Sequence, residues 1–114
     1  MNERYRYLQD LFDFKKSLDI VSSQLKGLEW DFEGEPLVLK KRQLIFAINS
    51  FLKGSKSAVE LEYWANLIEM REDIEFDREH EMLINDTIHK LANPELEGQL
   101  TNERCKQYLI ILEK

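Results

Sequence analysis

Cysteine, glycine and proline are all scarce in this chain of 114 residues, and each shortage excludes a class of structure. The single cysteine, Cys105, has no partner for an internal disulfide, so we expect a reducing compartment, the cytoplasm. Four glycines and two prolines are too few for the many tight turns of a β-sandwich or β-barrel. The scarcity of glycine also argues against a glycine-rich loop that would hold a nucleotide.

Long apolar runs and catalytic motifs are lacking as well. No segment approaches the roughly 18 apolar residues of a membrane-spanning helix, so we expect no membrane partner. Residues 1–6 are polar and no apolar stretch follows them, which predicts that there is no signal peptide. The chain contains no G-x-S-x-G or C-x-x-C pattern. We therefore expect a protein that is not an enzyme and binds no cofactor.

Candidate metal ligands and nucleophiles are few. The two histidines, His80 and His89, stand in neither an H-E-x-x-H nor an E-x-x-H pattern, so no metal site is expected. Cys105 falls on the apolar face of a predicted helix, which is typical of a buried, inert thiol. Alternating acids from Asp73 onward match a calcium-binding loop only in part. Arg78 replaces its glycine, and Ile84 replaces its last glutamate.

Apolar residues recur at helical spacing along most of the chain. In residues 3–27 they step alternately by four and three positions, which predicts one long helix. The members of this stripe are Tyr7, Leu11, Phe14, Leu18, Val21, Leu25 and Leu28. A bend near Ser22 and Ser23, or two helices with a break near Ser17, are the alternatives.

Turn and capping residues delimit the remaining helices. Gly34 and Pro36 predict a connection over residues 29–36. Ser57 and Glu60 fit a capping box, and Asp77 and Thr101 are further N-cap candidates. Helices are therefore predicted over residues 37–53, from 57 to about 70, over 78–92, and from Thr101 onward. This pattern predicts an all-α fold, with residues 1–114 as a single domain and a compact bundle of five or six mostly antiparallel helices.

The net charge of −6 is unevenly distributed. Residues 40–56 contain five basic residues and no acid, whereas residues 57–86 contain ten acids and two arginines, a local charge of −8. The densest group consists of Glu69, Glu72, Asp73, Glu75, Asp77, Glu79 and Glu81. An acidic balance disfavours nonspecific nucleic-acid binding and favours a basic partner.

Two interpretations of these acids stand side by side. They form either solvated helix faces or a docking surface that attracts a basic protein. A second acidic group in residues 29–35 is interleaved with aromatic side chains, which are frequent anchors of protein interfaces. The candidate rim anchors are Trp30, Asp31, Phe32 and Glu33. The alternative is that the two aromatic residues seal the bundle.

Two segments resemble a known family. They are LEYWANLIEMREDIE, residues 61–75, and LANPELEGQLT, residues 91–101. Together they resemble small helical bacterial proteins, some of which look like immunity proteins of contact-dependent growth inhibition and related polymorphic toxin systems. The resemblance covers about residues 57–101. It implies binding to a toxin, and many toxin domains of these systems are nucleases with basic clefts.

The resemblance and the charge distribution favour the same hypothesis. We expect an immunity protein, a monomer rather than a homodimer, that neutralises a cognate nuclease toxin by covering its basic active-site cleft with the acidic surface. Direct binding to nucleic acid is not expected. The alternative is a small adaptor or regulatory bundle that binds a host protein or nucleic acid through Lys40, Lys41 and Arg42.

Overall fold

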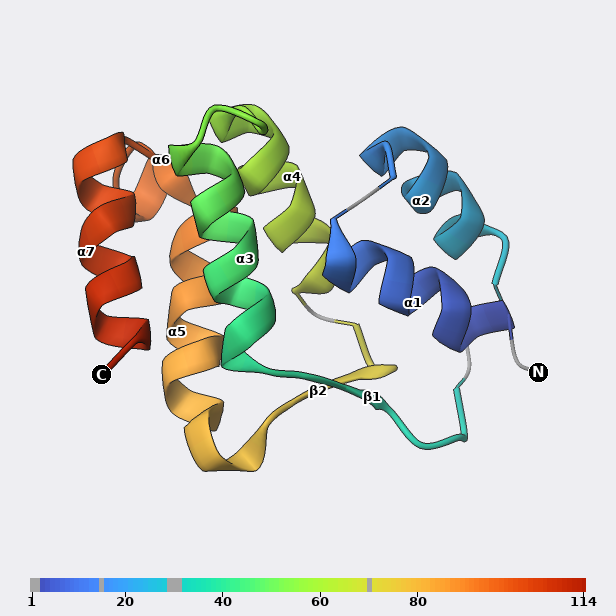
Figure 1. Cartoon of the computed structure of the whole chain (residues 1–114). Coiled ribbons are helices and arrows are strands. Elements are labelled where there is room, and N and C mark those ends of the chain that lie inside the picture. The colour runs from blue at the N-terminus through green and yellow to red at the C-terminus, as the bar shows by residue number, and fades with distance from the viewer. Residues whose placement is uncertain (1–2, 15, 29–31, 70) are drawn as a thin grey trace.

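The computed structural model describes residues 3–14, 16–28, 32–69 and 71–114 (Figure 1). In chain order, the elements are α1 (Glu3–Asp13), α2 (Leu18–Lys26), β1 (Leu37–Leu39), α3 (Lys41–Leu52), α4 (Ala58–Ile68), β2 (Ile74–Phe76), the 3₁₀ helix η1 (Arg78–His80), α5 (Glu81–Ala92), α6 (Pro94–Glu97) and α7 (Asn102–Leu112). The described residues thus form seven α-helices and a pair of short strands. Within this part of the chain, no helix has both the length and the apolar character needed to cross a bilayer.

The strands correct the expectation of an all-α bundle of five or six helices. The fold is mostly helical, but β1 and β2 form a parallel two-stranded sheet in which Leu37 pairs with Ile74 and Leu39 with Phe76. Residues 37–39 were predicted to start a helix. They are extended instead because all three pair with residues of β2, Val38 with Glu75 in addition to the two pairs above. Helices α3 and α4 form the crossover that a parallel pair requires.

Local capping explains where two of the helices begin. The Ser57 hydroxyl accepts the Glu60 N–H at 3.1 Å, and the Glu60 carboxylate accepts the Ser57 N–H at 3.0 Å, which confirms the capping box of α4. The Thr101 hydroxyl accepts the Arg104 N–H at 3.1 Å and caps α7. Asp77 also acts as a cap, but it caps the short helix η1, and α5 begins only at Glu81.

The break between α1 and α2 confirms the alternative of two helices within residues 3–27. Phe14 ends α1 in a left-handed conformation, with φ of 55°, which only glycine adopts without strain. Its ring stacks on that of Trp64, with centroids 5.6 Å apart and planes 5° from parallel. The Trp64 indole N–H in turn donates to the Leu11 carbonyl at 2.7 Å. This packing maintains the strained turn at Phe14.

Helix α4 lies at the centre of the core. Its inner residues Leu61, Trp64, Ala65 and Ile68 are fully or almost fully buried, and α4 packs against α2, α3 and α5. Figure 1 shows α1 and α2 on one side of α4, and α3, α5 and α7 on the other. The buried apolar residues of all these elements belong to one cluster. Helix α5 of this core also packs against β2 and η1 and so supports the turn that joins β2 to α5.

We predict that Phe14→Gly is more stable than Phe14→Ala by about 1 kcal/mol, because glycine removes the left-handed strain that alanine retains. Both variants lose the Trp64 stack and should be less stable than the wild type by about 2–4 kcal/mol. Urea unfolding followed by tryptophan fluorescence measures both differences. If Phe14→Ala were as stable as Phe14→Gly, or more stable, this result would contradict the left-handed turn at this position.

Candidate functional site

The predicted acidic surface runs from the end of α4 through β2 and η1 into α5. Its exposed members are Glu72, Glu79 and Glu81, and the Glu79 side chain is 82% exposed. Glu75 and Asp77 are partly exposed. We refer to these five acids, Glu72, Glu75, Asp77, Glu79 and Glu81, as the acidic corner. The structure places them along one continuous stretch of chain at the edge of the fold.

Three members of the acidic corner also have local partners, and one of them is Glu79, whose carboxylate lies 3.6 Å from the His80 ring nitrogen Nε2. The Glu75 carboxylate lies 3.5 Å from the Arg78 guanidinium, but the Arg78 side chain is 88% exposed, so this pair contributes little to stability. The Asp77 carboxylate accepts the Glu79 N–H at 3.4 Å, which caps η1. The Glu75 and Asp77 carboxylates therefore remain accessible to a second cationic partner.

Glu69, the first acid of the predicted surface, joins two helices. Its carboxylate lies 3.1 Å from the His89 ring nitrogen Nδ1 and accepts the Asn93 side-chain amide at 3.4 Å. Asn93 Nδ2 also donates to the His89 carbonyl at 2.9 Å. These contacts connect the C-terminal ends of α4 and α5. Glu69 is therefore partly engaged within the protein, and we do not include it in the acidic corner.

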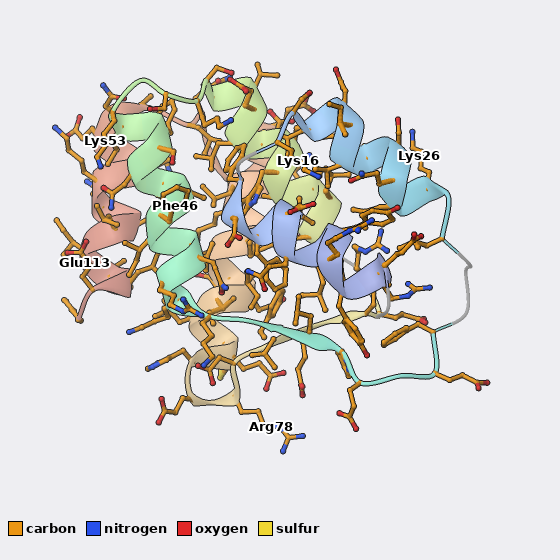
Figure 2. All side chains as sticks on the ribbon, turned by 45° about the vertical axis from the view of Figure 1, so that its right-hand side comes forward. Lys16, Lys26, Phe46, Lys53, Arg78 and Glu113 are labelled. Carbon is orange, nitrogen blue, oxygen red and sulfur yellow. The ribbon has the colours of Figure 1, made fainter. Side chains whose placement is uncertain are left out.

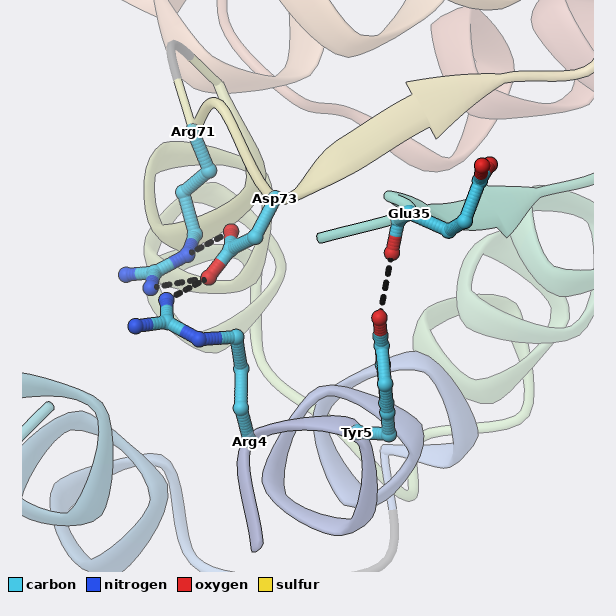
Figure 3. Close-up of polar contacts among 5 residues, drawn as sticks. All are labelled: Arg4, Tyr5, Glu35, Arg71 and Asp73. Carbon is cyan, nitrogen blue, oxygen red and sulfur yellow. Dashed lines mark hydrogen bonds and ion pairs between the residues drawn. The ribbon is translucent and has the colours of Figure 1, made fainter. Parts of the chain in front are cut away.

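Asp73 does not lie on the acidic surface, which corrects the prediction for this residue. Its side chain is 2% exposed and lies between two arginines (Figure 3). Arg4 donates to Asp73 Oδ2 at 2.6 Å, while Arg71 donates to Oδ1 and Oδ2, each at 2.8 Å. A buried carboxylate needs such partners, because burial of an unpaired charge is costly. Asp73 therefore has a structural role.

The same contacts change the acidity of the Asp73 carboxyl. Burial alone would raise its pKa, but the hydrogen bonds from Arg71 and Arg4, together with their positive charges, outweigh burial and hold the pKa below its ordinary value of 3.8. The carboxyl therefore stays ionised in the folded state until the solution is strongly acidic. This ion pair connects α1 to the turn before β2.

Of the four predicted rim anchors, the structure describes two, Phe32 and Glu33. Trp30 and Asp31 lie outside the described residues. Phe32 is half-buried against α1, with the Arg4 guanidinium 4.8 Å above its ring and the Tyr5 ring in edge contact at 6.3 Å. Phe32 therefore packs against the fold, as the alternative interpretation expected, and does not project as a rim anchor. Glu33 is exposed.

The parallel sheet brings the basic segment next to the acidic corner. The Asp77 N–H donates to the Leu39 carbonyl at 2.9 Å, so Asp77 follows β2 where Lys40 and Lys41 follow β1. The carboxyl ends of parallel strands meet at one edge of a sheet, which places opposite charges side by side there. Nothing in the sequence signals this proximity, because the segments are about 37 residues apart. A polyanion approaching the lysines would meet the acids too.

Groups suited to metal binding are not assembled among the described residues. Within residues 3–14, 16–28, 32–69 and 71–114, no three His, Cys, Asp or Glu side chains gather as a metal site. Burial raises the pKa of the Cys105 thiol to about 11, opposed only by the nearby charge of Arg104, so the thiol remains protonated at neutral pH. A protonated, buried thiol is a poor nucleophile.

An exposed methionine beside the acidic corner was missed by the sequence reasoning. Met82 is 87% exposed on the first turn of α5. It lines a shallow depression of about 510 Å³ together with Leu83, Asn85, Asp86 and His89. The position could have been found from the helical period, because Met82 lies two residues before Ile84 and so turns away from the buried face of α5.

Comparisons with known proteins identify no relative of this chain. No family model matches the chain, and no significant match was found among curated proteins or among solved structures. The distinguishing features of the site are the outward carboxylates of the acidic corner and the exposed Met82.

We predict that Asp73→Asn destabilises the protein by about 3 kcal/mol at pH 7, because it removes the carboxylate that both arginines contact. Asp86→Asn is a matched control, since Asp86 forms an exposed pair with Lys90 at 3.0 Å and should cost less than about 0.5 kcal/mol. Urea unfolding monitored by circular dichroism measures both changes.

The effect of Asp73→Asn should depend on pH. A carboxyl whose pKa is lowered by folding contributes stability above its unfolded value near 3.8, and this contribution is lost as the pH falls through the lower folded value. The difference between wild type and variant should therefore be constant at pH 5–7 and shrink below pH 3.8. A difference that stays constant into strong acid would show that the Asp73 charge is not its source.

Proposed function

We propose that this protein is an immunity protein that binds a cognate antibacterial nuclease toxin and covers the toxin's basic active-site cleft with the acidic corner. The observation that carries this proposal is the outward presentation of Glu72, Glu79 and Glu81 on a rigid support. Carboxylates presented in this way can occupy positions that phosphate groups of a nucleic acid would take. Opposite potentials also accelerate association and select the partner.

The shape of the corner supports the same proposal. In Figure 1, the turn that joins β2 to α5 through η1 is the lowest corner of the molecule. In Figure 2, Arg78 of η1 projects beyond the ribbon there. A convex, acidic corner complements a concave, basic cleft in both shape and charge. The resemblance of residues 57–101 to immunity proteins adds the biological context.

In this proposal the protein acts by affinity alone. It needs no catalytic group or cofactor, and as a monomer in the cytoplasm it would meet the toxin where the toxin reaches its substrate. The alternative adaptor, which would bind nucleic acid through Lys40 and Lys41, is disfavoured by the position of Asp77 beside them. Repulsion between phosphates and the acidic corner would offset the attraction of the basic residues.

A rescue experiment tests the proposal. The toxic C-terminal region encoded by the neighbouring gene is expressed in a test bacterium with and without this protein, and surviving colonies are counted. We predict rescue by the wild type. A variant with Glu72, Glu75, Glu79 and Glu81 changed to Gln should bind the purified toxin about 100-fold more weakly, since four charge contacts by these partly or fully exposed acids, at about 0.7 kcal/mol each, sum to about 2.8 kcal/mol.

A second variant controls for net charge. Asp19, Glu95, Glu97 and Glu103 are exposed acids on α2, α6 and α7, and their change to Asn or Gln alters the net charge by the same amount. This control should retain rescue and bind within about threefold of wild type. Equal weakening by both variants would show that only overall charge matters. Failure of the wild type to rescue cells from a proven toxin would refute the immunity proposal.

A further inference from the structure

Met82 is the most exposed of the large apolar residues identified in the described part of the chain. Its side chain is 87% exposed, compared with 77% for Leu96 and 74% for Val59. A single exposed apolar residue is ordinary on a protein surface. The location of Met82 is what distinguishes it, because it follows Glu81 directly and adjoins the acidic corner.

The surroundings of Met82 combine apolar and polar groups in the way an interface does. The depression beside it is lined by the half-buried Leu83 and by the polar side chains of Asn85, Asp86 and His89. Binding hot spots have this arrangement, in which an apolar side chain is surrounded by polar groups that exclude water when the partner docks. Met82 adds no core packing of its own, so its burial would come only from a partner.

We propose that Met82 is the apolar anchor of the toxin interface and inserts into an apolar recess in the wall of a basic cleft. The inference rests on the proposed function and specifies the partner surface further. Charge complementarity defines this occupant, since the exposed carboxylates of Glu79 and Glu81 precede Met82 and favour basic groups around the recess. Asp86, after Met82, already pairs with Lys90 at 3.0 Å and is not needed for this match. Methionine suits this role because its unbranched, polarisable side chain adapts to an irregular pocket.

The acidic corner and Met82 would then contribute to different steps of binding. The exposed carboxylates act at a distance and raise the association rate in a manner that salt weakens. Met82 acts only in contact, so its loss should appear in the dissociation rate. This difference separates an anchor from a residue that merely lies near the charged surface.

Three single variants test the proposal by binding kinetics with the purified toxin domain of the neighbouring gene. Met82→Ser should raise Kd at least tenfold, mainly through faster dissociation, and leave the salt dependence of association unchanged. Met82→Leu should stay within about threefold of wild type, because it restores the apolar volume. Leu96→Ser is the matched control. Leu96 has similar exposure and is also flanked by glutamates, but it lies beyond the far end of α5, which is about 18 Å long.

The outcomes separate this inference from the function on which it rests. If the wild type binds the toxin and both Met82→Ser and Leu96→Ser have a Kd within twofold of the wild-type value, Met82 is not an anchor. The immunity proposal would remain intact. Equal losses for Met82→Ser and Leu96→Ser would also overturn the anchor, since the effect would not be specific to the corner. No binding and no rescue by the wild type would overturn both. Because both substituted side chains are exposed, an unchanged unfolding temperature confirms that each variant is folded.

Discussion

The buried carboxylate of Asp73 is the interaction on which the placement of the candidate site depends. Its side chain accepts hydrogen bonds from Arg4 of α1 and Arg71 of the preceding turn. Its backbone carbonyl accepts the Leu37 N–H at 2.9 Å, which starts the pairing of β1 with β2. One residue thus connects the first helix, both strands and the turn after α4. The path of β2 determines where η1 begins, and so the position of the acidic corner.

This use of Asp73 shows why charge alone does not identify a surface. Seven acids lie within thirteen residues, and the sequence does not distinguish the one that is buried from those that are exposed. The distinction comes from Arg4, about 70 residues away in the chain, whose guanidinium reaches Asp73 only after α1 has packed near the sheet. Hydrogen bonds from both arginines offset the cost of burying the carboxylate. Of the other six acids, Glu69 contacts His89 and Asn93, and the five acids of the acidic corner are partly or fully exposed.

Features that depend on nearby residues were predictable, and features that depend on distant pairing were not. The capping box of Ser57 and Glu60 spans three residues, and the apolar stripe of α4 repeats within a few turns, so both could be read from the sequence. The strands contain only three residues each, and Leu37 takes its extended form through pairing with Ile74. A three-residue apolar run fits a helix or a strand equally well, and only its partner decides between them.

The same pairing determines how a partner would approach. Because β1 and β2 are parallel, Lys40 and Lys41 end up beside Asp77, so the edge of the sheet carries a boundary between positive and negative groups. A uniformly charged surface attracts an oppositely charged partner in many orientations, whereas a boundary favours the orientation that matches both signs. Like charges brought together cost free energy, so in the proposed interaction this boundary would also disfavour partners with the wrong charge pattern. In the proposed interaction, the short parallel sheet would therefore supply orientation, and the adjacent acidic corner would supply attraction.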